Sequence, residues 1–140
     1  MNTPVEETLV LIKPDGVARS LTGEILRRIE TKGYQLVDIR LVHAERDLLA
    51  LHYEEHQGKP FYEPLVEFME SGPIVAMRIA GNRVIEGLRM LSGTTDPTTS
   101  APGSIRGDLG RDWGLPVMQN LIHASDSPES AARELALWFA

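Results

Sequence analysis

The stretch YQLVDIRLVH at residues 34–43 does most to decide the fold class of this 140-residue chain. Val37, Ile39 and Leu41 alternate there with two charged residues, which predicts a half-buried strand. A strand with one face turned away from the core is typical of antiparallel sheets, whereas strands of parallel sheets are apolar on both faces. The pattern therefore favours an α+β fold and leaves a parallel, doubly wound sheet as the alternative.

Outward from this stretch, strands and helices alternate in the order β-α-β-α-α-β-α-β-α. Strands are expected at residues 8–13, 34–43, 74–80 and 117–123. Helices are expected at 22–33, 47–56, 61–71 and 82–93, with a final helix after residue 127, and the helix at 61–71 is expected to bury Leu65, Phe68 and Met69. The candidate N-cap residues, chosen by side-chain type, are Thr22, Asp47, Asn82 and Ser127.

The composition is that of a globular protein, with 42% hydrophobic residues. Its length predicts a single domain over residues 1–140, and its apolar runs are too short to cross a membrane. The absence of cysteine excludes disulfides, thiolate nucleophiles and cysteine-bound metals. A net charge of −6 argues against nonspecific nucleic-acid binding. We therefore expect a soluble, cytoplasmic domain with no membrane partner and no specific nucleic-acid partner.

Residues 93–116 contain five glycines and three prolines and show no periodicity, which is typical of a functional loop. No Walker-type or dinucleotide-binding glycine motif occurs in the sequence. The loop instead carries Thr95 and Arg106, and Arg89 closes the helix before it. Because guanidinium groups suit phosphate oxygens, these residues suggest a phosphate site, although loop arginines are more often simply solvated.

His123 follows an apolar run just before a turn into the last helix. A free imidazole is largely neutral near pH 7, so a histidine displayed there can act as a nucleophile toward phosphorus. Glu134 is spaced to orient the ring from that helix. The alternative is a structural histidine beside an exposed glutamate.

The segment HYEEH at residues 52–56 matches the H-x-x-E-H pattern of inverted zinc peptidases. On a helix, His52 and His56 would lie on one face with a carboxylate between them, which is a geometry suited to zinc. No third ligand is evident in the sequence. A zinc hydrolase is therefore kept only as an alternative, against a plain polar helix face with Tyr53 turned partly inward.

The segment NLIHASDS at residues 120–127 closely resembles the N-x-x-H-[GA]-S-D-S signature of nucleoside diphosphate kinases. The resemblance covers essentially the whole chain. It includes, in order, IKPDGV at 12–17, HY at 52–53, KPFY at 59–62, SGP at 71–73, TDP at 95–97, PGSIRGD at 102–108 and LWF at 137–139.

This resemblance implies a ferredoxin-like α+β sandwich with a four-stranded antiparallel sheet covered by helices. It also implies a ping-pong phosphotransferase, in which a nucleoside triphosphate such as ATP gives its γ-phosphate to His123 and a nucleoside diphosphate takes it. Such an enzyme maintains the pools of NTPs and dNTPs, with Mg2+ bridging the substrate phosphates rather than sitting in a protein cage. A base held by stacking implies broad base specificity.

The resemblance also assigns roles by position. In catalysis, Glu134 and Ser125 would position His123, and Tyr53 would lie near the transferred group. Lys13 and Asn120 would bind the ribose hydroxyls and the phosphate end of the nucleotide. Phe61 would stack on the base beside two apolar neighbours, and three further residues would hold phosphate oxygens. The apolar neighbours are Leu65 and Val117, and the phosphate ligands are Arg89, Thr95 and Arg106.

Two features depart from the family pattern. Ala124 stands where glycine is commoner, so a positive φ at that position would be strained. The segment LGRDWGLP at residues 109–116 is a few residues longer than usual, which bears on the contact at Val117 and on how subunits meet. A homo-oligomer, hexamer or tetramer, is implied. A noncatalytic nucleotide-binding module is the alternative function, and the intact set of site residues argues against it.

Overall fold

The computed structural model describes residues 5–140 and is built on a four-stranded sheet in the order β2-β3-β1-β4. All three strand pairs are antiparallel, so the expected α+β sandwich with a ferredoxin-like sheet is confirmed and the parallel alternative is wrong. The strands are β1 (Val5–Ile12), β2 (Gln35–Val42), β3 (Ile74–Asn82) and β4 (Ile122–Ala124).

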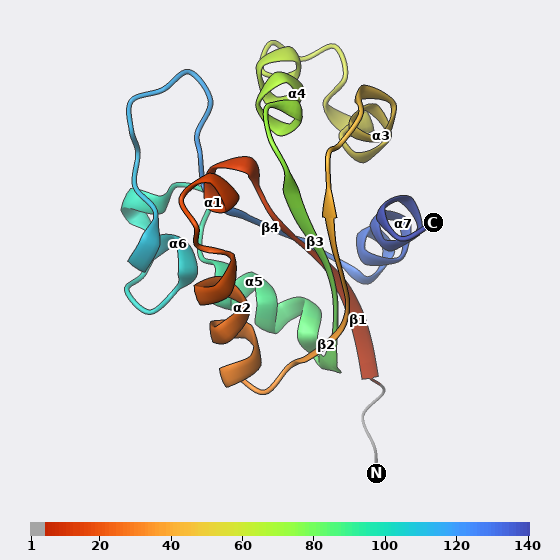
Figure 1. Cartoon of the computed structure of the whole chain (residues 1–140), viewed down its shortest axis with the longest axis vertical. Coiled ribbons are helices and arrows are strands. Elements are labelled where there is room, and N and C mark those ends of the chain that lie inside the picture. Colours follow the sequence, from red (N-terminus) through yellow and green to blue (C-terminus); the bar gives the residue numbers. More distant parts are fainter. Residues whose placement is uncertain (1–4) are drawn as a thin grey trace.

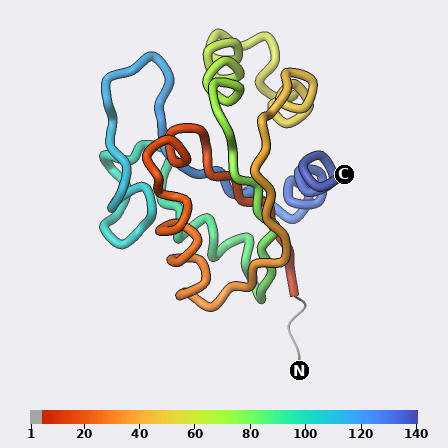
Figure 2. The backbone as a smooth tube through the Cα atoms, in the orientation of Figure 1, coloured from red at the N-terminus to blue at the C-terminus, as the bar shows by residue number. Residues whose placement is uncertain are grey.

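Helices cover both faces of this sheet (Figure 1; the chain path is followed in Figure 2). Side chains from α2 and α5 pack on one face, and side chains from α3, α4 and α7 pack on the other. The helices are α1 (Pro14–Ala18), α2 (Thr22–Thr31), α3 (Arg46–His52), α4 (Tyr62–Glu70), α5 (Val84–Ser92), α6 (Ile105–Leu109) and α7 (Pro128–Trp138).

The central strand β1 divides the core into two halves. Successive side chains of a strand point to opposite faces, so Val10 and Ile12 join the α2/α5 side while Leu9 and Leu11 join the α3/α4/α7 side. All four are fully buried. At roughly 1.5–3 kcal/mol for each fully buried aliphatic side chain, β1 is a major source of stability and a rigid base for the residues at its carboxyl end.

Three predicted N-caps are wrong. Leu21 and Glu45 precede α2 and α3 in place of Thr22 and Asp47, which lie inside the first turn. Before α5 the N-cap is Arg83, in the left-handed region at φ 54°, because β3 runs on through residue 82 and leaves no room for Asn82 to cap. The fourth prediction is confirmed, since the Ser127 side chain accepts a hydrogen bond from the Ser130 amide.

The strand predicted at residues 117–123 is also wrong in extent. Regular pairing with β1 covers only Ile122–Ala124, and residues 117–121 are irregular. The cause lies at Leu121, whose φ of 72° turns the chain sharply immediately before the strand. Ala124 lies inside β4 and is not among the positive-φ residues, so alanine fits there without strain.

The loop at residues 93–116 contains two short helical turns, Pro97–Thr99 and α6, that the sequence did not reveal. Ser104 caps α6 by accepting a hydrogen bond from the Gly107 amide. In α4, Met69 is buried as predicted, but Leu65 and Phe68 are only half-buried.

The strand that suggested the fold exposes its apolar face. Val37, Ile39 and Leu41 are 47%, 43% and 70% exposed, because β2 is an edge strand and these side chains have no helix packed over them. The prediction that these alternating residues form a strand is confirmed. The prediction that their apolar face is buried is wrong for the single chain. No helix among residues 5–140 is long and apolar enough to span a membrane.

Candidate active site

His123 projects from β4 and meets Glu134 on α7. The Nε2 atom of His123 lies 2.7 Å from Oε1 of Glu134, and the hydroxyl of Ser125 donates to the same oxygen at 2.7 Å. The capped start of α7 directs Glu134 back toward the strand, where it is buried. The predicted trio therefore forms one hydrogen-bonded cluster.

Glu134 is held in its ionised form despite this burial. Burial alone favours the neutral acid, but the hydrogen bond and charge interaction with His123, together with the Ser125 hydroxyl, hold the pKa of Glu134 below its usual value. A carboxylate can only accept hydrogen bonds, so Nε2 of His123 carries the proton. The lone pair of the neutral ring is then on Nδ1.

A second group of predicted residues lies at the carboxyl end of β1. The ammonium of Lys13 donates to Oδ1 of Asn120 at 2.8 Å, and the Asn120 amide donates to the Thr95 carbonyl at 3.0 Å. Burial, reinforced by the nearby positive charge of Arg106 and opposed by Asp15, lowers the pKa of Lys13 to about 8. Lys13 is thus a cation poised to lose its proton just above neutral pH.

A tight turn at Leu121 connects this group to His123. The Ile122 amide donates to the Asn120 carbonyl at 2.8 Å, which closes a three-residue γ-turn with Leu121 at its centre. Because Leu121 has a positive φ, this is the rare and strained form of the γ-turn. The Asp15 carboxylate accepts from the Leu121 amide at 3.1 Å, and the Leu121 carbonyl accepts from the Lys13 amide at 2.8 Å. Asp15 was not predicted as a site residue, although it belongs to the IKPDGV segment that carries the resemblance.

Arg106 is almost fully buried behind the same turn. Its guanidinium donates to the carbonyls of Asn120 (3.1 Å), Ile122 (2.5 Å) and Gly93 (2.9 Å). Burial lowers the pKa of Arg106 to about 10, with a further contribution from the positive charge of Arg89. Arg106 therefore braces the backbone around the turn as well as supplying positive charge.

Arg89 is exposed at the end of α5, and its guanidinium makes one long contact, 3.4 Å to the Ala124 carbonyl. Unlike Arg106, it keeps most of its donors for a ligand. Thr95 is also exposed and contributes its carbonyl to Asn120. Of these two predicted phosphate ligands, Arg89 belongs to α5 and Thr95 to the loop that follows it.

A cavity of about 590 Å³ opens beside Lys13, between α4 and the segment that leads to β4. Phe61 is 48% exposed at its rim, and Leu65 and Val117 lie within it. The cavity brings together six of the predicted nucleotide-binding residues, which are Lys13, Phe61, Leu65, Thr95, Val117 and Asn120. The extra residues of the 109–116 segment do not remove Val117 from this cavity.

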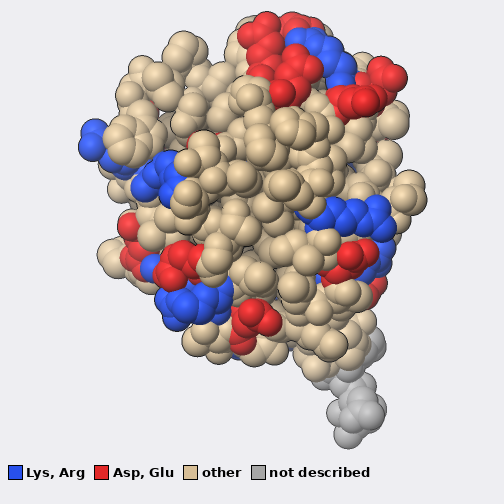
Figure 3. Space-filling model, in the orientation of Figure 1, with Lys and Arg blue, Asp and Glu red and all other residues tan. Residues whose placement is uncertain are grey.

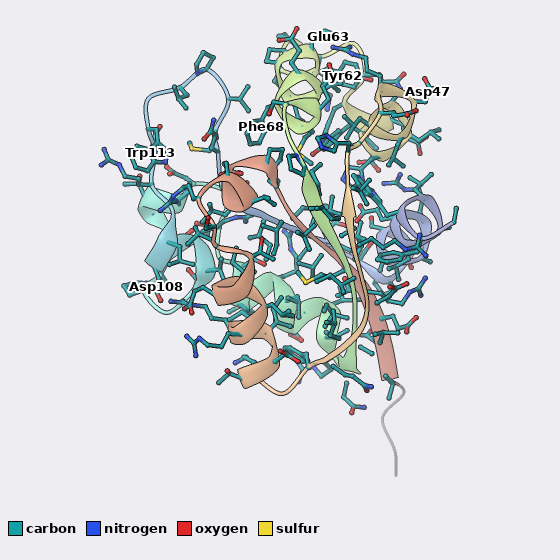
Figure 4. The ribbon with its side chains drawn as sticks, viewed as in Figure 1. Asp47, Tyr62, Glu63, Phe68, Asp108 and Trp113 are labelled. Carbon is teal, nitrogen blue, oxygen red and sulfur yellow. The ribbon has the colours of Figure 1, made fainter. Side chains whose placement is uncertain are left out.

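That segment runs along the outer side of the molecule opposite α7 (Figure 4). Arg19 donates to the Leu109 carbonyl at 2.7 Å and lies over the ring of Trp113, which also stacks on Arg111. Trp113 itself is about half exposed.

The zinc-peptidase interpretation of residues 52–56 is wrong. Helix α3 ends at His52, and His56 lies in a separate 3₁₀ turn, Glu54–His56, where its ring faces Tyr53 and Phe61. Tyr53 is buried against His52, with ring centroids 4.6 Å apart. His52 turns the other way, toward His123, with centroids 4.8 Å apart. The sequence did not identify His52 as a neighbour of His123.

Side chains with metal-binding donors come together at one place among residues 5–140, where donor atoms of His52, His123 and Glu134 lie within 4.8 Å of one another. Two imidazoles and one carboxylate are unlike the all-oxygen ligands that Mg2+ prefers. This cluster therefore does not have the donor set that Mg2+ prefers.

Comparisons with known proteins agree with the motifs. The sequence model of the family described as nucleoside diphosphate kinase matches residues 6–140. The nucleoside diphosphate kinase of Streptomyces avermitilis is 59% identical over 135 residues, 96% of each chain. The kinase of Pyrococcus furiosus is 50% identical over 96% of this chain and 83% of its own.

Solved structures agree as well. The structure of a halophilic nucleoside diphosphate kinase from Halobacterium salinarum in complex with CDP has a TM-score of 0.91 and 44% identity, covering 97% of this chain and 88% of that one. A transition-state mimic of the Borrelia burgdorferi enzyme with vanadate and ADP has a TM-score of 0.90, 30% identity and the same coverage of each chain. By full-length sequence similarity and by fold, this chain belongs to the nucleoside diphosphate kinase family, whose enzymes transfer phosphate between nucleoside tri- and diphosphates through a phosphohistidine.

Proposed function

We propose that this chain performs the reaction of its family with Nδ1 of His123 as the nucleophile. The observation that carries the proposal is the 2.7 Å contact between Nε2 of His123 and the ionised Glu134. It puts the ring proton on Nε2 and the lone pair on Nδ1 without any proton transfer during the reaction. A nucleophile prepared in this way needs only a correctly placed phosphate.

In the first half-reaction Nδ1 attacks the γ-phosphorus of ATP or another nucleoside triphosphate. An N–P bond forms, the bond from phosphorus to the bridging oxygen breaks, and the nucleoside diphosphate leaves with that bonding electron pair. The imidazole becomes a positively charged phosphohistidine that keeps its Nε2 proton, and Glu134 stabilises this charge while Ser125 holds the carboxylate in place. An oxygen of the acceptor diphosphate reverses the sequence in the second half-reaction.

The phosphate chain of the nucleotide would be held by cations around the turn at Leu121. Phosphoryl transfer demands positioning and charge neutralisation more than covalent chemistry. Lys13, Arg89 and Arg106 provide the charge, while Thr95 and Asn120 provide polar contacts. Tyr53, which is buried against His52, would lie beside the transferred group. Magnesium, as the divalent metal that accompanies nucleotides in such kinases, would enter with the substrate phosphates.

The base would stack on Phe61 in the 590 Å³ cavity, with Leu65 and Val117 as apolar neighbours. No charged side chain other than Lys13 lines that cavity, so the base edge has few groups to read it. Stacking tolerates every base because each has a π-face. The related structures hold a cytidine and an adenosine nucleotide, which supports broad specificity, including deoxynucleotides and a role in maintaining NTP and dNTP pools.

The exposed face of β2 supports a homo-oligomer. Val37, Ile39 and Leu41 form an apolar row on an edge strand, and an uncovered edge of this kind is a ready surface for pairing with another copy. In Figure 3 the middle of the visible face is largely free of charged side chains, basic and acidic groups lie at its right beside β2, and acidic groups gather over α3 and α4. Leu41→Lys is expected to lower the assembly state in sedimentation velocity; an unchanged state would exclude this face as the interface.

We propose that residues 1–140 act as one catalytic domain, that the assembly is a hexamer or tetramer, and that it works in the cytoplasm without a specific nucleic-acid partner. The acidic balance of the chain supports the last point.

The decisive experiment uses γ-labelled ATP with Mg2+ and no acceptor, on the intact protein and on His123→Ala. We expect acid-labile, base-stable label on the intact protein alone, discharged by added GDP. If neither protein is labelled, the chain is a noncatalytic nucleotide-binding module. Label on both would move the nucleophile away from His123.

A further inference from the structure

Trp138, in the last turn of α7, makes a hydrogen bond that the mechanism does not use. Its indole Nε1–H donates to Nδ1 of His52 at 3.0 Å, and both side chains are about 95% buried. The two rings meet edge to face, with centroids 5.6 Å apart and planes at 88°. This contact joins α7 to the end of α3 directly behind the nucleophile.

The bond determines where the proton of His52 resides. An indole N–H can only donate, so Nδ1 of His52 must present its lone pair to Trp138. With Nδ1 unprotonated, the ring cannot be the doubly protonated cation and is neutral. A neutral imidazole carries a single proton, which is therefore on Nε2. Neither ring nitrogen of His52 has a lone pair to spare.

The nitrogen of His123 that faces Glu134 also has no free lone pair. Its Nε2 carries the proton that is donated to Glu134. His52, His123 and Glu134 have donor atoms within 4.8 Å of one another, a grouping of residue types suited to zinc or another transition metal. A metal needs lone pairs, and the hydrogen-bonding pattern leaves none on the nitrogens that face this cluster.

We propose that Trp138 is a positioning residue that acts through His52. By fixing the tautomer of His52, Trp138 keeps a neutral ring packed against His123. As a result, the cluster of His52, His123 and Glu134 does not bind transition metals. The edge of the His52 ring contacts the His123 ring at 75°, with centroids 4.8 Å apart. Fixing the first ring therefore restricts rotation of the second, which keeps Nε2 of His123 on Glu134 and Nδ1 available for phosphorus. The statement that Nδ1 stays available for phosphorus rests on the proposed role of His123, whereas the effect on metal affinity does not.

The tautomer can be observed in the unmodified protein. A long-range 1H–15N correlation spectrum separates protonated from unprotonated ring nitrogens, and His52→Gln identifies the His52 signals. We expect His52 to appear as the Nε2–H tautomer, unprotonated at Nδ1, with no change between pH 6 and 8. A His52 that averages between tautomers, or that carries its proton on Nδ1, would overturn the proposal.

The consequence for metals is tested with Trp138→Phe, which keeps the aromatic bulk and removes the N–H. Zn2+ is titrated by calorimetry in the absence of nucleotide, and thermal unfolding is followed in parallel to verify folding. We expect Trp138→Phe to bind one Zn2+ per chain at least about tenfold more tightly than the parent protein, in the range by which indirect partners change metal affinity. The matched control is Trp113→Phe, which removes the other indole of the chain, on the side opposite α7 (Figure 4).

The double variant Trp138→Phe with His52→Phe identifies the ligand. It is expected to lose the gained Zn2+ affinity, since His52 supplies one of the three donors. Equal Zn2+ affinity in Trp138→Phe and the parent would contradict the proposal, as would a gain that survives in the double variant. Because calorimetry needs no turnover, these results are independent of whether His123 is phosphorylated.

Discussion

At the proposed transfer end of the site, two 2.7 Å hydrogen bonds join His123 and Ser125 to a buried Glu134, whereas at the proposed base end Phe61 leaves 48% of its surface exposed beside an open apolar cavity. The side chains of the transfer end are held in place by their hydrogen bonds to one another. The base end offers one aromatic face and aliphatic neighbours, with few polar groups fixed in direction.

The difference follows from what each end must do. Transferring a phosphoryl group requires atoms placed within a few tenths of an ångström, so the side chains that surround the nucleophile are restrained by one another. Accepting several bases requires the opposite, because every directed polar group would favour one base over the rest. The proposed assignment thus separates specificity for phosphate from tolerance of the base in space on one small domain.

Glu134→Gln tests the transfer end and is expected to have the largest effect. Glutamine keeps the size and one acceptor oxygen but cannot neutralise the charged phosphohistidine. Losing a charge-assisted hydrogen bond of about 1.5–3 kcal/mol corresponds to a roughly 10–100-fold slower phosphorylation of His123. Rapid-quench measurement of phosphoenzyme formation gives the rate directly.

The companion variant is Ser125→Ala, which leaves the carboxylate charge in place. Its loss of rate should be smaller than that of Glu134→Gln. If both variants slow the reaction equally, Glu134 acts through its position and not through its charge, and the transfer end is less dependent on electrostatics than we infer.

The site also shows how much could be predicted from the sequence. His123, Glu134, Lys13 and Asn120 were all predicted as site residues, because each lies in or near a motif, and the structure places His123 beside Glu134 and Lys13 beside Asn120. The contacts of His52 and Trp138 could not be predicted, because two residues 86 positions apart meet only after α3 and α7 pack side by side. Local patterns carry no information about such meetings.

The fold was predicted to a similar extent. Alternation at residues 34–43 indicated a strand and antiparallel pairing, but not which face the rest of the chain would cover. At residues 117–121, apolar composition suggested a strand, yet the hydrogen bonds of Asp15 and Arg106 hold Leu121 in a strained turn. Tertiary contacts override local propensity there, as they often do near functional groups.

Lys13, which lies between the two ends, predicts an intermediate effect that depends on pH. Its pKa of about 8 in the free protein means that the ammonium is mostly present at pH 7 and mostly lost at pH 9. Because the protonated form binds the phosphates, KM for a nucleoside diphosphate should rise about tenfold over that interval. Steady-state kinetics from pH 6.5 to 9.5 at constant ionic strength provide the test.

Lys13→Arg is the control for this pH dependence, since a guanidinium stays charged throughout the range. The rise in KM with pH should disappear in that variant, whatever its absolute activity. A rise of the same size in both proteins would assign the titration to another group and make Lys13 an ordinary charged residue.

Phe61→Ala tests the base end and is expected to have the smallest effect. One-sided stacking on a half-exposed ring contributes about 1 kcal/mol, the lower end of the range for base–aromatic stacking. KM should therefore rise roughly fivefold, and by the same factor for ADP, GDP and CDP, while Phe61→Trp should restore it. Initial rates with the three acceptors at matched ATP measure this. If the loss were confined to one base, the open end would be reading base identity through a directed contact, and the division between a preassembled transfer end and a tolerant base end would not hold.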